Sequence, residues 1–304
     1  MVTGRRQIEL GAMERTSLPP LHARARDARR RRPVVGDPHA AGLADDLELG
    51  DGPGRADALC TLLRGAILDE WVRAFVAEHP TCTVVELGPG LDRRADRLGG
   101  EGPAHWVDVE LPEVAELRRE LLPGPGGPEP DPAAGPVSSP AAGPVSSPVA
   151  GPVSSPVAGP VSSLVAGSAL DEDWLDTARA LPGPYLVVAD SVLTLLPEQG
   201  VQRLVFTAAR MLPGAVLATD VLSRAAAARI SGGALCGVEV DWTCEDPREL
   251  EPWGLRLLEA CGAGEPPAAV AARIPYTTRA FATALRAVPA LRGHRLARYE
   301  ILPG

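Results

Sequence analysis

The stretches TVVELGPGLDRRADRL (residues 83–98) and HWVDVELPEV (residues 105–114) decide the fold of this chain. The apolar run at residues 83–87 predicts a buried strand. It ends at Gly88-Pro89-Gly90, where residues without side chains allow a sharp turn and a close approach to a ligand. A second β-rich run ends at Glu110, 20 residues after Gly90. A carboxylate at that offset can accept hydrogen bonds from ribose hydroxyl groups, so the pattern predicts a βαβ unit that binds a nucleoside.

The kind of nucleoside depends on position 93. A dinucleotide fingerprint has a third glycine there, which lets the helix pack closely on the strand and direct its N-terminus at a pyrophosphate. This chain has Arg93 instead. It also lacks the G-x-x-x-x-G-K-[ST] motif of an ATP- or GTP-binding phosphate loop. We therefore favour S-adenosylmethionine, which has no phosphates, over a nicotinamide cofactor.

Several stretches resemble, in chain order, segments of the leucine carboxyl methyltransferase family. They are RARDARRRRPVVGDPHA, LLRGAILDEWVRAFVAEHP, VVELGPGLDRRADRL, VDVELPEVAELRRELLP, VVADSVLTLLPEQGVQRLV and WTCEDPRELEPWGLRLLEA. The resemblance is strongest to a bacterial branch of polyketide O-methyltransferases, and it runs from about Leu21 onward apart from one insertion. It implies an S-adenosylmethionine-dependent O-methyltransferase that acts on a small-molecule carboxyl or hydroxyl group in polyketide or other secondary metabolism.

The implied fold agrees with the order of elements expected from periodicity. Strands and helices alternate, as an α/β fold requires. The resemblance implies a doubly wound, Rossmann-like methyltransferase sheet, mostly parallel with one antiparallel strand, and an N-terminal helical addition. The pattern predicts helices at 57–79, 111–122, 199–211 and 225–230, and later strands at 162–166, 185–189, 215–220, 255–259 and 298–302.

The resemblance also implies a cofactor site at the carboxyl edge of the sheet, where ligands of such folds bind. Its nine residues are Arg64, Glu86, Gly88, Gly90, Glu110, Leu111, Ser168, Ala169 and Asp190. The two glycines would border the cofactor, Glu110 would hold its ribose, and Ser168 with Ala169 would flank the adenine. Asp190 stands where the family has a Glu near the amino group of the methionine part. Arg64 matches an Arg that pairs with the cofactor carboxylate.

Three of these assignments have alternatives. Arg64 lies among apolar neighbours and either binds the cofactor or only extends its charge from a helix face to solvent. Glu86 either orders a water near the cofactor or caps the backbone. Asp108 lies on the same side of its strand as Glu110 and is a second candidate for the ribose contact. We favour Glu110 because it falls on the family's acidic position.

No catalytic residue is assigned from the sequence. Transfer of a methyl group from a sulfonium requires alignment of acceptor oxygen, methyl and sulfur, which contributes roughly 7–11 kcal/mol in well-oriented cases. An ionised carboxylate acceptor needs no base, whereas a hydroxyl group would use one, and no histidine occupies a motif position. Two departures from the family, Arg93 within L-D-R-R in place of L-D-T-R and Leu195 in place of a Tyr, support an alternative. That alternative is a cofactor-binding protein of the same fold with weak or no turnover.

Composition limits the partners. The 304 residues carry a net charge of −9, which argues against a nucleic-acid partner. The one basic cluster, residues 24–32, is read as a solvated helix face, with an anion-binding patch as the alternative. No run of about 20 apolar residues predicts a membrane span. The five cysteines form no C-x-x-C pair, the five histidines show no H-x-x-x-H spacing, and no export signal is recognisable. We expect a cytoplasmic enzyme with a small-molecule acceptor, no metal and no evident protein partner.

An octapeptide repeat interrupts the resemblance. AAGPVSSP occupies residues 133–140 and again 141–148, and VAGPVSSP (149–156) and VAGPVSSL (157–164) follow. Each copy is too short and too rich in proline to form a solenoid, which indicates a disordered linker. The chain then divides into an N-terminal extension with a helical lid (1–55), a first part of the methyltransferase domain (56–122), the insertion (123–163) and the remainder (164–304). Expanding a surface loop to this length costs only about 1.5 kcal/mol in closure entropy.

The acceptor itself is not identified by the sequence. We expect the determinants of its specificity in residues 24–38 and 221–242.

Overall fold

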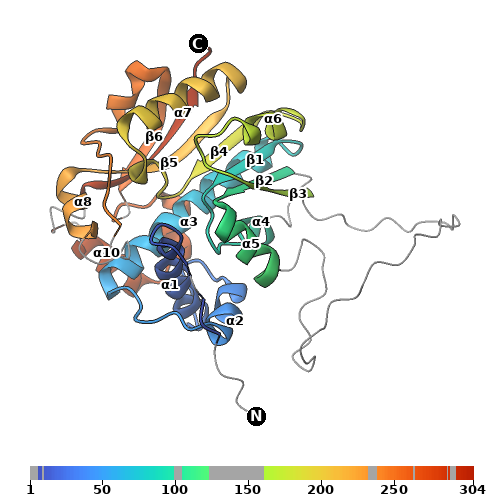
Figure 1. The fold of residues 1–304 in the computed structure, drawn as a ribbon. Coiled ribbons are helices and arrows are strands. Elements are labelled where there is room, and N and C mark those ends of the chain that lie inside the picture. The colour runs from blue at the N-terminus through green and yellow to red at the C-terminus, as the bar shows by residue number, and fades with distance from the viewer. Residues whose placement is uncertain are drawn as a thin grey trace, which may run out of the picture.

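The computed structural model describes residues 6–8, 10–98, 105–122, 161–231, 238–262, 264–285, 287 and 292–304. These residues form a seven-stranded sheet in the order β3-β2-β1-β4-β5-β7-β6 (Figure 1). The strands are β1 (Thr83–Leu87), β2 (His105–Glu110), β3 (Val161–Ala166), β4 (Tyr185–Ala189), β5 (Val216–Leu222), β6 (Leu255–Gly262) and β7 (His294–Ile301). The first five strands in chain order pair in parallel, and β7 runs antiparallel to both β5 and β6. The expected Rossmann-like α/β fold is confirmed.

Helices cover both faces of the sheet. They are α1 (Leu18–Ala28), α2 (Pro38–Asp46), α3 (Arg55–Glu78), α4 (Arg94–Leu98), α5 (Pro112–Leu121), α6 (Asp173–Arg179), α7 (Glu198–Met211), α8 (Arg224–Ser231), α9 (Ala268–Arg273) and α10 (Tyr276–Leu285). Short 3-10 helices occur at η1 (Glu14–Ser17), η3 (Leu193–Leu195) and η4 (Pro247–Trp253). The helices predicted at 57–79, 111–122, 199–211 and 225–230 correspond to α3, α5, α7 and α8.

Strand alternation sorts the core into two layers. Successive side chains of a strand point to opposite faces, and in β1 Val84 packs with α3 while Val85 and Leu87 pack with α6 and α7. All five residues of β1 are buried, as expected for a central strand that is covered by helices on both faces. The βαβ unit read from residues 83–110 is therefore the centre of the sheet.

The last two strands are longer than the sequence indicates. β7 begins at His294 rather than at residue 298, and β6 extends to Gly262 rather than to residue 259. The physical reason is long-range pairing, because the antiparallel ladder runs from Val216↔Glu300 to Leu222↔His294 and continues the pairing past the apolar run seen in the sequence.

The repeat insertion borders β3. Residues 123–160 lie outside the described part of the chain, as do Gly232 and Gly233. β3 begins at Val161, so three residues that the sequence places in the insertion pair with β2. The predicted disorder and the division into domains stay predictions.

The N-terminal helices form a small layer of their own. α1 packs on α2 and α3, and Leu21, Ala25 and Leu43 share an apolar cluster with Leu91 just after the glycine turn. Figure 1 shows this layer beside α3 and α5. Within the basic cluster, the prediction of a solvated face is wrong for Arg24. This side chain is buried, and its Nε donates a 3.0 Å hydrogen bond to Asp37. The other arginines of the cluster are exposed.

Across the described residues, no helix combines the length and the apolar character needed to cross a bilayer.

Candidate active site

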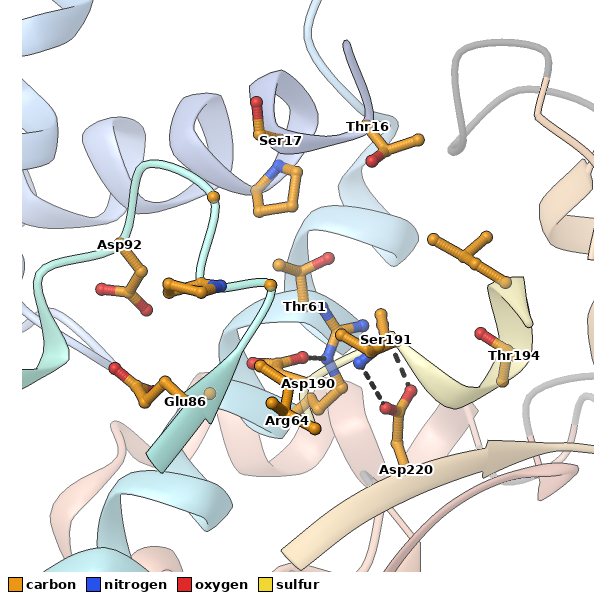
Figure 2. A pocket seen from close by; sticks show the side chains of 18 of the residues that line it. Thr16, Ser17, Thr61, Arg64, Glu86, Asp92, Asp190, Ser191, Thr194 and Asp220 are labelled. Atoms are coloured by element: carbon orange, nitrogen blue, oxygen red, sulfur yellow. Dashed lines mark hydrogen bonds and ion pairs between the residues drawn. The ribbon is translucent and has the colours of Figure 1, made fainter. Parts of the chain in front are cut away.

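One cavity, of about 370 Å³, lies where the carboxyl ends of the central strands meet the N-terminal layer. Its volume falls in the range of small-molecule sites. All nine residues expected at the cofactor site border it, although they come from α3 and from the ends of four strands. Figure 2 shows Arg64, Glu86 and Asp190 around the cavity, with Thr16 and Ser17 above the glycine turn.

The glycine turn requires its glycines. Gly88 and Gly90 both have φ +59°, a left-handed conformation that disfavours residues with a side chain. A Cβ atom on Gly88 would lie 2.9 Å from Cγ2 of Val192, and one on Gly90 would lie 2.9 Å from Cβ of Ser17. The turn therefore leaves no room for a side chain at either position.

Gly88→Ala is expected to lower the free energy of unfolding by about 2–3 kcal/mol, because left-handed strain and a steric overlap add together. Gly214→Ala is the matched control: Gly214 has φ +80° but open space where its Cβ would be, so only the strain of about 1 kcal/mol applies. Urea denaturation of both variants measures the difference. Equal losses would show that close packing at Gly88 contributes nothing.

Glu110 is held in place by the backbone around it. Its carboxylate accepts hydrogen bonds from the N–H of Gly90 (2.6 Å) and of Leu111 (2.9 Å). Burial raises the pKa of Glu110, and these two donors partly oppose the shift. Asp108, the alternative for the ribose contact, is not among the residues that border the cavity. Its Oδ2 accepts a 2.5 Å hydrogen bond from Arg118.

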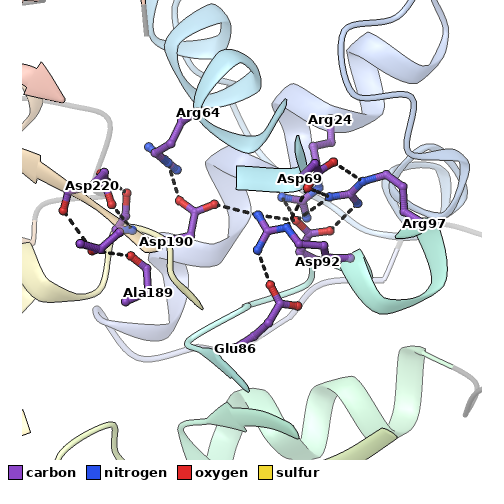
Figure 3. Close-up of polar contacts among 12 residues, drawn as sticks. Arg24, Arg64, Asp69, Glu86, Asp92, Arg97, Ala189, Asp190 and Asp220 are labelled. Atoms are coloured by element: carbon purple, nitrogen blue, oxygen red, sulfur yellow. Dashed lines mark hydrogen bonds and ion pairs between the residues drawn. The ribbon is translucent and has the colours of Figure 1, made fainter. Parts of the chain in front are cut away.

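A chain of buried ion pairs connects the turn to α3 and β4. Arg94 donates from Nε to Asp69 (2.7 Å), from Nη1 to Glu86 and from Nη2 to Asp190 (3.2 Å). The Nε of Arg64 donates to the other carboxylate oxygen of Asp190. Figure 3 shows Asp190 between Arg64 and the rest of this network, which continues through Asp69, Asp92 and Arg97. Glu86 borders the cavity and its Oε1 accepts from Arg94, so its two alternative roles stay predictions.

This chain is similar to known methyltransferases along most of its length. A model of the leucine carboxyl methyltransferase family matches residues 19–138. The tetracenomycin polyketide synthesis O-methyltransferase TcmP of Streptomyces glaucescens is 31% identical over 301 residues, which cover 96% of this chain and 98% of TcmP. The chain belongs to the leucine carboxyl methyltransferase family. The family expected from the sequence is confirmed, and with it the class of enzyme, an S-adenosylmethionine-dependent methyltransferase.

Two further proteins share a lower sequence identity with this chain. The S-adenosyl-L-methionine-dependent methyltransferase dpfgK of Gibberella zeae is 28% identical over 133 residues, which cover 39% of this chain and 44% of dpfgK. The solved structure of the mitomycin 7-O-methyltransferase MmcR is 16% identical, with a TM-score of 0.42, and the match covers 81% of this chain and 57% of MmcR.

One of the two departures from the family pattern, Arg93, lies outside the lining of the cavity. The sequence suggests that Arg93 places a long cation beside the cofactor turn, but Arg93 is not among the residues that border the cavity. Its guanidinium contacts Asp96 and lies 3.3 Å from Nδ1 of His39. The turn directs the next residue, Arg94, inward instead. The second departure, Leu195, does border the cavity.

Polar residues that the sequence analysis missed at the cavity include Arg94, Asp220 and His294. Asp69 was also missed; it lies behind the lining and accepts from Arg94. Arg94 was recognisable, since it occupies the Arg of the family's L-D-T-R segment. Asp220 and His294 carry no sequence signal, because only the pairing of β5 with β7 brings them together. Their side chains lie 2.8 Å apart at the cavity. Within the described residues, no cluster of three or more His, Cys, Asp or Glu side chains has the arrangement of a metal site.

Proposed function

We propose that this protein transfers a methyl group from S-adenosylmethionine to an oxygen atom of a small, polyketide-like acceptor. The observation that carries the proposal is that the glycine turn, the anchored Glu110 and the cationic Arg64 all border one cavity. TcmP, whose name places it in tetracenomycin polyketide synthesis, supports the polyketide class of acceptor. A cytoplasmic location is part of the same proposal.

The residues present fit such a cofactor. Glu110 uses one lone pair on each oxygen for a backbone N–H, so further lone pairs are available to two ribose hydroxyl groups. Ser168 and Ala169 border the cavity next to β3, where they would flank the adenine ring.

The methionine end has cationic and anionic groups available. Nη2 of Arg24 is buried without a hydrogen-bond partner although Arg24 borders the cavity, which suits a cofactor carboxylate. Arg64 is a second cation for that carboxylate, and Asp190 would accept from the amino group. When bound, the cofactor supplies an activated methyl group. The protein aligns the acceptor oxygen with this methyl group and the sulfur.

An apolar part of the cavity would hold the acceptor. Hydrophobic side chains of η3 and its two caps, the end of β5, α8 and the loop before α2 border it, namely Val35, Val192, Leu195, Leu196, Leu222 and Ile230. Leu195, in place of a family Tyr, adds apolar surface there. A role of Leu195 in acceptor binding accounts for this departure from the family. It weakens the alternative of an inactive binding protein.

Calorimetry with S-adenosylmethionine and with NAD tests the cofactor. We expect binding of S-adenosylmethionine only, and binding of NAD alone would overturn the proposal. Methyl transfer to a panel of aromatic polyketide acids and phenols then tests the reaction, because sustained turnover of any member rules out the inactive alternative.

A further inference from the structure

One arginine at the cavity stands apart from the buried network around the glycine turn. Among the described residues five arginines border the cavity, and four of them are linked to one another through Asp92 and Asp190: Arg24, Arg64, Arg94 and Arg97. The fifth, Arg229, lies in the last turn of α8, and its Nη2 donates to Asp57 in the first turn of α3. Asp57 also borders the cavity, so the two residues form a separate ion pair in its wall.

The period of α3 places this pair at a distance from the expected cofactor site. With 3.6 residues per turn, Asp57, Thr61 and Arg64 lie on one face of the helix, and all three border the cavity. Figure 2 shows Thr61 and Arg64 at this wall. The two helical turns from Asp57 to Arg64 span about 10 Å. The pair therefore lies well beyond Arg64, which binds Asp190 beside the proposed methionine end.

The wall near the pair carries uncharged groups. Cys60 and Thr61 lie on the intervening turn of α3 and border the cavity, and burial raises the pKa of the Cys60 thiol, which keeps it uncharged at neutral pH. Ile230 of α8 packs against the cluster that contains Leu222, and both border the cavity. An apolar acceptor body can therefore extend along this wall until its far end reaches the ion pair.

The pair itself has hydrogen-bonding capacity left. A guanidinium group has several N–H donors and a carboxylate has several lone pairs, and the contact between Arg229 and Asp57 uses one of each. Nε of Arg229 is buried and has no hydrogen-bond partner within the described part of the chain. Each side chain is 29% exposed, and ion pairs that water can reach contribute little to stability. The fold therefore gains little from placing this pair at the cavity.

The charges of the pair select the kind of group that it can bind. Asp57 and Arg229 neutralise each other, so an anion drawn to the guanidinium meets a carboxylate beside it, and like charges repel at such distances. A neutral hydroxyl group has a donor and acceptor lone pairs, so it can donate to Asp57 and accept from Arg229 at once. Hydrogen bonds to charged partners are also stronger than those between neutral groups. A hydroxyl group thus uses both sides of the pair.

We propose that Asp57 and Arg229 bind a neutral hydroxyl group at the end of the acceptor that does not react. This rests on the methyltransferase function proposed above. The acceptor then has a reacting oxygen near the cofactor, an apolar body along α3 and a hydroxyl group about two helical turns from Arg64. Either a carboxyl or a hydroxyl group can receive the methyl in this arrangement. Arg229 falls within residues 221–242, where the sequence places determinants of acceptor specificity.

Three matched probes test this specificity: 2-naphthoic acid, 6-hydroxy-2-naphthoic acid and naphthalene-2,6-dicarboxylic acid. They share one carboxyl group and one ring body, and their far substituent is a hydrogen, a neutral hydroxyl or an anion. Calorimetry with protein saturated with S-adenosylhomocysteine gives each dissociation constant. We expect the hydroxy acid to bind the parent about 5–30-fold more tightly than 2-naphthoic acid does, and the dicarboxylic acid to bind no more tightly than 2-naphthoic acid.

Two variants should change this preference in different ways. Arg229→Met keeps the length of the side chain but removes its donors. The advantage of the hydroxy acid should then fall below about twofold, while affinity for 2-naphthoic acid and for S-adenosylhomocysteine changes less than about threefold. Asp57→Asn keeps an acceptor oxygen but removes the repelling charge, so it should raise affinity for the dicarboxylic acid by about tenfold or more. A pair with only a structural role would not exchange one preference for the other.

Arg210→Met is the matched control. Arg210 lies in the last turn of α7 and donates a 3.1 Å hydrogen bond to Glu172, and neither residue is among those that border the cavity. This variant should match the parent with all three probes.

Four results would overturn the inference. They are equal affinities for the three probes or binding by none, tightest binding of the dicarboxylic acid to the parent, a hydroxyl preference that survives Arg229→Met, and no gain for the dicarboxylic acid in Asp57→Asn. Failure of the parent to bind S-adenosylhomocysteine is a different result, because it overturns the proposed function itself.

Discussion

Replacing Arg94 with Met is expected to lower the free energy of unfolding by about 3–5 kcal/mol, because it leaves buried carboxylates without their cation. Arg94 is 2% exposed and binds Asp69, Glu86 and Asp190. Met has a similar length and fills the space, so the loss reports charge rather than volume. Urea denaturation followed by circular dichroism measures it.

Arg73→Met provides the matched control. Nη1 of Arg73 lies 3.6 Å from Glu70 Oε2 on the outer part of the same long helix, α3, and both side chains are partly exposed. Such pairs contribute about 0–1 kcal/mol, so this variant should be nearly as stable as the parent. Similar losses in the two variants would contradict a structural role for the buried network.

The loss caused by Arg94→Met should also depend on pH. Burial raises the pKa of Glu86 to about 7 even with Arg94 present, and the opposing effect of Arg94 disappears in the variant. A carboxyl group whose pKa is higher in the folded state favours folding when protonated, and this contribution is lost as the pH rises through the folded value. The deficit relative to the parent should therefore be smaller at pH 5 than at pH 8. A deficit that shrinks as the pH rises would contradict this assignment.

Glu110→Ala is expected to weaken S-adenosylmethionine binding by about 10–150-fold, which corresponds to roughly 1.5–3 kcal/mol for the loss of hydrogen bonds to a charged group. The same change removes the acceptor for the N–H groups of Gly90 and Leu111, so the turn itself loses support. Isothermal calorimetry measures the dissociation constant.

Two further variants separate the contribution to cofactor binding from the support of the turn. Glu110→Gln keeps an acceptor oxygen but loses the charge and should fall between the parent and the alanine variant. Glu113→Ala removes an exposed carboxylate from the first turn of α5 and should bind as the parent does. Parent-like affinity in Glu110→Ala would remove Glu110 from the proposed ribose site.

The sequence was sufficient for features that depend on local pattern and spacing. Three local features lie within 28 residues: the apolar run of β1, the two glycines that follow it, and the acidic residue at the end of β2. Each is recognisable from its residue types and spacing alone. Parallel strands end at one edge of a sheet, so residues at four strand ends were expected to meet there. They do, around one cavity.

Contacts between distant segments were decided by the tertiary structure. Arg64 and Asp190 are 126 positions apart, and Asp220 and His294 are 74 apart. Residue types alone do not specify such pairs, because an arginine or histidine finds its partner only once the sheet order and the register of β7 on β5 are set. Burial then makes each pairing obligatory, since a charge removed from water requires a partner. The sequence by itself determined the class of fold and predicted which strand ends border the cavity, whereas folding determined which side chains neutralise one another there.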